Sequence, residues 1–149
     1  MTFEIGDPRL PERFWSKVEP DESGCWLWAA GKDRDGYGGF RMGSGNTRAH
    51  RTAYQHLVGE IAAGLVIDHL CRVRSCVNPA HLEPVANKVN VLRGVGPCAV
   101  NAQKTHCIHG HELTDDNISP WNLPKRNCLI CMRATRARYL ERLAAKAAA

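Results

Sequence analysis

The chain has 149 residues, of which 20 are Lys or Arg and 15 are Asp or Glu, and its formal net charge is +5. This length suits one domain, or two small ones if bound metals supplement a thin hydrophobic core. No segment approaches the roughly 18 apolar residues of a membrane span, and charges and prolines interrupt the stretch where a signal peptide would lie. The composition therefore predicts a cytoplasmic protein with no membrane partner.

Seven cysteines and seven histidines are a large number for this length. An odd number of cysteines does not suit a closed set of disulfides. In a reducing compartment, cysteines at short spacing more often bind a metal ion. The cysteine pattern therefore predicts metal sites.

In the first part of the chain, the sequence pattern predicts a short helix at residues 11–18, a β-hairpin and a longer helix. The hairpin is indicated by aromatic and apolar residues on both sides of the glycine-rich turn at residues 35–39. Residues 47–58 form the longer helix, which Gly59 ends. Four apolar residues share one of its faces: Ala49, Ala53, Tyr54 and Leu57.

The second part predicts a buried strand at residues 65–68, another at 82–85, and a two-turn helix that Gly94 stops. Residues 94–106 show little periodicity and are expected to form a linker. A small unit follows, and residues 132–149, rich in alanine and arginine, predict a helical tail.

Three candidate zinc ligands lie close together with the spacing C-x4-C-x4-H: Cys71, Cys76 and His81. A structural zinc ion takes four such ligands, and Cys25 is the only cysteine before this loop. The alternative, that these cysteines are merely small buried side chains, does not suit a loop with an Asn-Pro turn and basic residues. Asp68 and His69 remain outside the ligand set, which leaves His69 free to act as a base.

The order of these residues resembles that of a known family. Asp68 and His69 end a predicted strand, the zinc ligands follow, and Asn90 lies in the next predicted helix. This order resembles that of the HNH endonucleases of the ββα-metal fold, of phage and homing type. The spacing of the residues is most similar to that in the zinc-containing branch of this family, the His-Cys box endonucleases. Asn78 and His81 would take the second and third positions of the family motif. Residues 13–42, 49–61 and 107–134 also resemble segments of phage HNH proteins.

The resemblance implies an α+β fold. Its centre would be a small ββα-metal core, or His-Me finger, with an N-terminal β-hairpin and a C-terminal zinc-stabilised unit that carries the helical tail. Residues 1–94 would hold the hairpin and the nuclease core, residues 95–106 a linker, and residues 107–149 the zinc unit and tail. A phage origin, and so the cytoplasm of the host cell, is suggested by the resemblance alone.

The resemblance further implies hydrolysis of phosphodiester bonds in double-stranded DNA, with 5′-phosphate and 3′-hydroxyl products. His69 would be the general base, and Asp68 and Asn90 would hold one Mg²⁺ or Mn²⁺ ion through oxygen ligands. An arginine near the scissile phosphate would add stabilisation, with Arg48 and Arg41 as candidates. One departure from the family pattern is Ala86, where relatives have Thr or Ser as the helix N-cap. Either Asn87 would cap the helix one residue later, or the start of the helix would be less stable.

A second zinc site follows from the spacings C-x3-H and C-x2-C: Cys107, His111, Cys128 and Cys131. His111 is preferred because three residues separate it from Cys107 and because the relatives carry Gly-His there, with His109 and His106 as alternatives. A unit of about 25 residues cannot bury enough apolar surface to fold alone, so zinc would supply its folding energy. Cys98 has no predicted partner.

Basic and aromatic residues predict contacts with DNA. The tail would lie on phosphate through its arginines, among them Arg133, Arg136 and Arg138, the alternative being a solvated helix. Tyr37 and Arg41 of the predicted hairpin would read bases in the major groove. Leu140, Leu143 and Ala144 share one face of the tail helix, which leaves a homodimer open.

Two other functions fit part of the pattern. A non-catalytic zinc protein that binds DNA would use both zinc sites and the tail, but it has no use for Asp68, His69 and Asn90 together. An HNH nuclease of a phage DNA-packaging assembly would use all of these residues, but only within the larger assembly.

Overall fold

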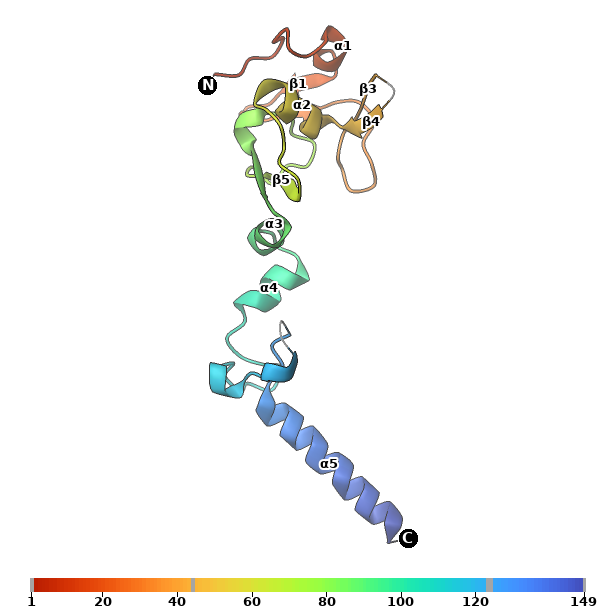
Figure 1. Cartoon of the computed structure of the whole chain (residues 1–149), viewed down its shortest axis with the longest axis vertical. Coiled ribbons are helices and arrows are strands. Elements are labelled where there is room, and N and C mark those ends of the chain that lie inside the picture. Colours follow the sequence, from red (N-terminus) through yellow and green to blue (C-terminus); the bar gives the residue numbers. More distant parts are fainter. Residues whose placement is uncertain (1, 44, 123–124, 149) are drawn as a thin grey trace. The chain divides into compact units, whose positions relative to one another are not determined.

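The computed structural model describes residues 2–43, 45–122 and 125–148, and it divides into two compact units, Met1–Gly94 and Val95–Ala149. The elements of the first unit, in chain order, are α1 (Glu12–Trp15), β1 (Val18–Pro20), β2 (Trp26–Trp28), β3 (Gly39–Met42), β4 (Gly45–Arg48), α2 (Ala49–Leu57), β5 (Leu65–His69), η1 (Pro79–His81), β6 (Leu82–Ala86) and α3 (Asn87–Arg93). The second unit contains α4 (Pro97–Gln103), η2 (Asp115–Asn117), η3 (Pro120–Asn122) and α5 (Leu129–Ala147) (Figure 1).

An aromatic core holds the beginning of the first unit together. Phe14 of α1, Trp28 of β2 and Phe40 of β3 are fully buried. Their ring centroids lie 5.1, 5.0 and 5.8 Å apart, which is the separation of interlocking aromatic rings. Ala49, Ala53 and Leu57 of α2 pack against the same core, as the helical spacing of these residues predicts.

Only a single antiparallel bridge, Lys32 with Gly38, is formed across the glycine-rich turn, so the prediction that the strands on either side of it pair as a hairpin is wrong for β2 and β3. β2 pairs with β1, and β3 pairs with β4. Residues 29–38 form a loop in which the Asp33 carboxylate accepts the backbone N–H groups of Asp35 and Tyr37. Each strand pairs with its neighbour across a turn shorter than this loop, and a shorter turn costs less closure entropy.

Most other predicted elements are present, with shifted ends. α2 begins at Ala49 because the two residues before it belong to β4. The segment predicted as a linker contains the helix α4, and the tail helix α5 begins at Leu129. The N-cap of α3 is Ala86, which makes no side-chain cap bond, so the expectation that Asn87 caps the helix is wrong: Asn87 is already helical.

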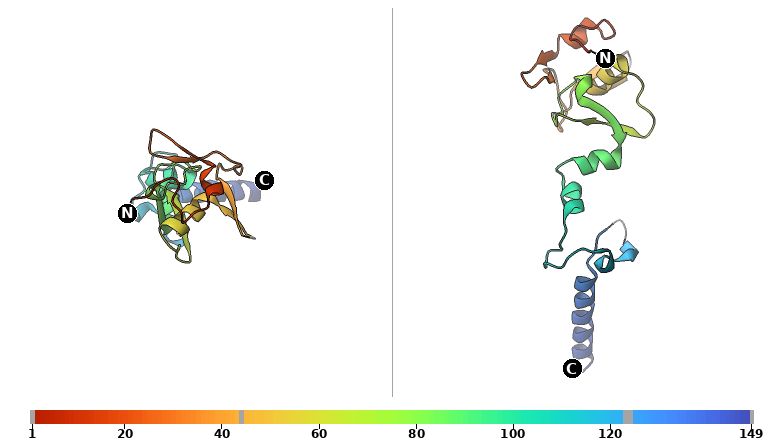
Figure 2. Two further views of the ribbon diagram at one scale, coloured as in Figure 1. Left: turned by 90° about the horizontal axis from the view of Figure 1, so that it is seen from above. Right: turned by 90° about the vertical axis from the view of Figure 1, so that its left-hand side faces the viewer.

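The elements that carry the site are β5, β6 and α3, which follow one another as strand, strand and helix. β5 and β6 are antiparallel, with Asp68 opposite Glu83 and His69 opposite Leu82. The right panel of Figure 2 shows this ribbon, coloured green, running into α3. The small α+β architecture and its ββα core agree with the predicted fold class. No helix in the described part of the chain is long and apolar enough to cross a membrane.

Candidate active site and metal centres

Four predicted zinc ligands meet in the first unit, from the residue before β2, the loop after β5 and the end of η1: Cys25, Cys71, Cys76 and His81. Their ligand atoms all lie within 4.8 Å of one another. The sulfurs of Cys25 and Cys76 lie 3.5 and 3.6 Å from His81 Nδ1. Tetrahedral zinc with Zn–S bonds of about 2.3 Å and Zn–N bonds of about 2.0 Å requires S···N separations of about 3.6 Å. The cluster therefore fits a structural zinc ion.

Asn78 ties the parts of this cluster together. Its Nδ2 donates to the carbonyl of Gly24, 2.8 Å away, and its Oδ1 accepts the backbone N–H of Ala80 at 3.0 Å. Gly24 directly precedes Cys25, and Ala80 directly precedes His81. One buried amide therefore fixes two of the four ligands.

The thiols of the cluster lie in surroundings that disfavour their charged form. Burial raises the pKa of Cys76 to about 12 and also raises the pKa of Cys71. A cation between the sulfurs offsets this desolvation by stabilising thiolates directly. The chemistry of the donor set thus agrees with its geometry.

His69, at the end of β5, is held by the same loop. Its ring is 5% exposed, and Nε2 donates to the carbonyl of Cys76 at 3.1 Å. Because a carbonyl oxygen can only accept, Nε2 carries the proton, and the lone pair of the neutral ring lies on Nδ1. Desolvation lowers the pKa of His69, which keeps the ring neutral near pH 7. The arrangement is that of an oriented base.

Asp68 precedes His69 and is also buried, at 2% exposure. Its Oδ1 lies 2.7 Å from Arg72 Nη1, and its Oδ2 lies 3.5 Å from Arg93 Nη1 of α3. Arg93 also pairs with Glu83, which stands opposite Asp68 in the strand register. The carboxylate is therefore fixed beneath α3 and compensated by two guanidinium groups.

Asn90 is the one residue of α3 that is not exposed; the structure describes all seven residues of this helix. Arg93, three positions later, contacts Asp68, and residues three apart lie on the same helical face. Asn90 therefore belongs to the face of α3 that is turned to β5. Its role as a metal ligand stays a prediction.

Sequence reasoning missed His50, a buried residue of α2 beside His69. Its ring is 4% exposed, and its centroid lies 4.8 Å from that of His69 and 5.2 Å from that of Tyr37. Nδ1 of His50 is buried without a hydrogen-bond partner among the described residues. Its helical spacing from Ala53 and Leu57 could have indicated that it points inward.

The two arginine candidates of the sequence differ in position. Arg48 stacks on Tyr37, with its guanidinium carbon 4.2 Å from the ring centroid, and pairs with Asp33 at 3.2 Å. Since the ring of Tyr37 lies 5.8 Å from that of His69, Arg48 is near the base. Arg41 lies in β3 opposite Asn46, and no contact with His69 is seen among the described residues.

A second cluster of four predicted zinc ligands lies in the second unit: Cys107, His111, Cys128 and Cys131. His111 Nδ1 lies 3.4, 3.7 and 3.3 Å from the sulfurs of Cys107, Cys128 and Cys131. These separations again suit tetrahedral zinc. His111 belongs to this cluster, whereas His106 and His109 do not, and Cys98 is exposed outside both clusters.

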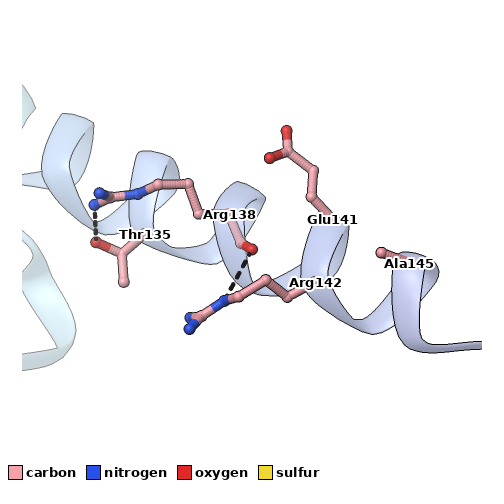
Figure 3. Close-up of a pocket in the computed structure, with 5 residues that line it drawn as sticks. All are labelled: Thr135, Arg138, Glu141, Arg142 and Ala145. Atoms are coloured by element: carbon pink, nitrogen blue, oxygen red, sulfur yellow. Dashed lines mark hydrogen bonds between the residues drawn. The ribbon is translucent and has the colours of Figure 1, made fainter.

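The helix α5 is exposed from Met132 onward and carries the predicted DNA-binding arginines. Figure 3 shows the residues that line a hollow on one of its faces, where Arg138 donates to the hydroxyl of Thr135 at 3.4 Å. The other lining residues include Glu141 and Arg142 but no histidine or cysteine. This hollow therefore offers charge to a partner and lacks the groups of a catalytic centre.

The first unit combines a two-stranded ribbon, a helix packed on it, a buried histidine at the strand end and a Cys/His cluster that could hold zinc. Together these features define a protein of the ββα-metal fold. Comparison with known families agrees: residues 47–92 match the family described as HNH endonuclease. The chain belongs to the HNH endonuclease family and is of the phage type. The family indicates a nuclease that acts on DNA.

Two phage proteins are similar to the chain. Protein 2.8 of Escherichia phage T7 is 29% identical over 110 residues, which cover 73% of this chain and 71% of that protein. The Uncharacterized gene 5.3 protein of Enterobacteria phage T3 is 30% identical over 80 residues, covering 48% of this chain and 77% of that protein. No solved structure matches the chain.

Proposed function

We propose that the protein is a Mg²⁺-dependent endonuclease, also active with Mn²⁺, that hydrolyses phosphodiester bonds of double-stranded DNA. The observation that carries the proposal is the orientation of His69, whose Nε2 is bound by the Cys76 carbonyl at 3.1 Å. This bond leaves Nδ1 as the basic nitrogen of a ring whose pKa burial lowers. Such a histidine has no use in a protein that only binds DNA.

In the proposed reaction, His69 Nδ1 takes a proton from a water molecule as its oxygen attacks phosphorus. The bond between phosphorus and the 3′ oxygen breaks opposite the attacking oxygen, and the departing 3′ oxygen takes a proton from solvent water. This yields 5′-phosphate and 3′-hydroxyl ends, and His69 afterwards returns its proton to solvent. Asp68 and Asn90 would hold the divalent ion, because both offer the oxygen ligands that Mg²⁺ prefers. When bound, the ion supplies positive charge that stabilises the transition state and the departing oxygen.

Contacts with DNA are proposed for both units. Tyr37 and Arg48 lie next to His69, beside a cavity of about 320 Å³ that Lys32 and Asn46 also line. Arg41, on the neighbouring ribbon, is exposed and available to base edges. In the second unit the exposed arginines of α5 are proposed to lie on phosphate: Arg133, Arg136 and Arg138.

A homodimer through α5 stays a prediction. Leu140 and Leu143 are 49% and 45% exposed, which leaves apolar surface for a partner without identifying one. Nicking would be the result of a monomer with one site, whereas a two-fold dimer would cut both strands.

The test is cleavage of supercoiled plasmid by the zinc-loaded protein with Mg²⁺, resolved into nicked and linear products on a gel. We expect cleavage by the wild type, its loss with EDTA, and a loss of at least about 100-fold in His69→Ala. A wild type that binds DNA but leaves plasmid intact would establish the non-catalytic alternative. Weak nicking that rises only with phage packaging proteins would establish the assembly-dependent one.

A further inference from the structure

Arg93 of α3 lies at the centre of a charged cluster that the sequence did not single out. The cluster consists of Asp68, Glu83, Arg72 and Arg93. β5 and β6 place Asp68 directly opposite Glu83, and two like charges in that position repel each other. Nη1 of Arg93 contacts both carboxylates, 3.5 Å from Asp68 Oδ2 and in an ion pair with Glu83. Arg93 thus joins α3 to both strands.

The contacts of Arg93 leave most of its guanidinium group unused. Both contacts are made by Nη1, and Nη2 and Nε have no hydrogen-bond partner among the described residues. The side chain is 39% exposed, so these donors reach solvent. Arg72 is held more closely to Asp68 than Arg93 is, because its Nη1 lies 2.7 Å from the other carboxylate oxygen, Oδ1. Arg93 is therefore both anchored and free to bind a ligand.

The proposed function places the scissile phosphate close to the free donors of Arg93. The proposed function puts the divalent ion on Asp68 and Asn90, and the ion contacts the scissile phosphate. A guanidinium group within 3.5 Å of Asp68, one helical turn beyond Asn90, is within reach of the same phosphate. Two parallel N–H groups of arginine match two phosphate oxygens.

Resting on the proposed function, we propose that Arg93 is a catalytic residue that binds a non-bridging oxygen of the scissile phosphate through Nη2 and Nε. Glu83 holds the guanidinium in place beside the divalent ion, whose charge would otherwise repel it. Arg93 then takes the role for which the sequence offered Arg48 and Arg41. Arg48 is instead held on the His69 side by Tyr37 and Asp33.

The first test compares cleavage by Arg93→Ala, Arg93→Lys and the matched control Lys88→Ala in the zinc-loaded full chain. Lys88 is exposed on α3 and lies on the opposite face from Asn90, so its loss removes the same charge from the same helix. We expect kcat to fall about 100-fold or more in Arg93→Ala, to fall less in Arg93→Lys, and to stay unchanged in the control. Cleavage by Arg93→Ala within about threefold of the wild type would overturn the proposal.

The second test measures binding without cleavage. In a His69→Ala background, the affinity for a DNA duplex is measured against salt concentration, and the affinity for Mn²⁺ is measured without DNA. Loss of one phosphate contact should reduce the salt slope by about 1 in Arg93→Ala, while Mn²⁺ binding stays equal or becomes tighter because a nearby positive charge is removed. An unchanged salt slope with weaker Mn²⁺ binding would mean that Arg93 only supports Asp68, and the proposal would be wrong.

Glu83→Gln supplies a third comparison. If Glu83 acts by holding Arg93, Glu83→Gln should lower kcat when Arg93 is present. In the Arg93→Ala background, Glu83→Gln should cause no further fall in kcat. Additive losses would contradict this role. Failure of the proposed function itself is recognised separately, because the wild type would then not cleave DNA at all.

Discussion

Cys76 serves the first Cys/His cluster and the proposed base His69 through two different atoms. Its sulfur is one of the four ligand atoms, and its carbonyl accepts the proton of His69 Nε2 at 3.1 Å. The base is therefore oriented by a backbone group whose position depends on the zinc cluster. The zinc ion is not expected to touch DNA, yet the chemistry should depend on it.

Replacing Cys71 tests this dependence, because Cys71 is a ligand that does not contribute the carbonyl. We expect Cys71→Ala to lose one of the two zinc ions and to lower cleavage at least about 100-fold, since the loop that orients His69 is released. Zinc content by mass spectrometry and plasmid cleavage are the measurements. Cys98→Ser, at the exposed cysteine outside both clusters, should change neither.

His50 gives the stability of the first unit a pH dependence. Desolvation lowers the pKa of His50 from 6.5 to about 3, helped by the repulsion that His69 would exert if both rings were protonated. The unfolded chain binds a proton on this ring below about pH 6.5 and the folded chain does not, so acid favours unfolding. Between pH 7 and pH 5, His50 should lower the free energy of unfolding by about 2 kcal/mol.

The measurement is denaturant unfolding of the zinc-loaded protein at pH 7 and pH 5, compared with His50→Phe. When the pH falls from 7 to 5, the free energy of unfolding of His50→Phe should decrease by about 2 kcal/mol less than that of the wild type. His56→Phe places the same change at an exposed position of α2 and should behave like the wild type. Equal losses in wild type and His50→Phe would show that His50 is not buried as a neutral ring.

At the level of elements, α4 is joined to the second zinc unit by one side chain. Arg126 donates to the carbonyls of Asn101, Ala102 and Lys104 at 3.1, 2.9 and 2.7 Å. These carbonyls lie at the C-terminal end of α4, where the Asn101 carbonyl also accepts the backbone N–H of the C-cap residue Lys104 at 3.4 Å. A cation there caps the helix further and interacts favourably with its dipole. The segment that sequence reasoning treated as a linker is thus anchored to the zinc unit.

Arg126→Ala should release α4 at a cost of about 1–2 kcal/mol in the local free energy of unfolding. Hydrogen exchange of the α4 amides is the measurement, and faster exchange confined to residues 97–104 is the expected result. Lys125→Ala removes the neighbouring charge and should leave exchange unchanged. Exchange that stays slow in Arg126→Ala would contradict the capping role.

At the level of the whole molecule, the basic charge of α5 is proposed to add affinity for DNA without adding chemistry. Replacing Arg133, Arg136 and Arg138 together by alanine should weaken binding to all DNA sequences alike. The salt slope should fall by up to about 3, because each lost phosphate contact releases about one counterion fewer. The rate of cleavage at saturating DNA should not change.

Fluorescence anisotropy with labelled duplexes at several salt concentrations is the measurement. Glu141→Gln removes the acid of the same helix and should leave binding equal or tighter. If the triple variant keeps the wild-type salt slope, α5 is a solvated helix that does not lie on DNA.

Local patterns predicted much of the fold and most of the site. The clustering of Cys71, Cys76 and His81 was predicted because candidate ligands for one metal ion lie close together in the chain, and the same holds for Cys128 and Cys131. β5, β6 and α3 were found because short apolar runs and a glycine stop are local signals. The pairing partners of β2 and β3 were not predicted from the sequence. Strand pairing depends on competition between turns and on the shared aromatic core, and neither is a local signal.

The sequence by itself determined the two sets of candidate metal ligands, the candidate base His69 and the succession of strand, strand and helix, since each depends on residue type and short spacing. Only the tertiary structure decided how His69 is oriented, that His50 packs beside it, and that Arg93 reaches Asp68 and Glu83. The physical reason is the same for all three. These contacts join side chains from different elements, and their geometry exists only after the core and the zinc cluster have brought those elements together.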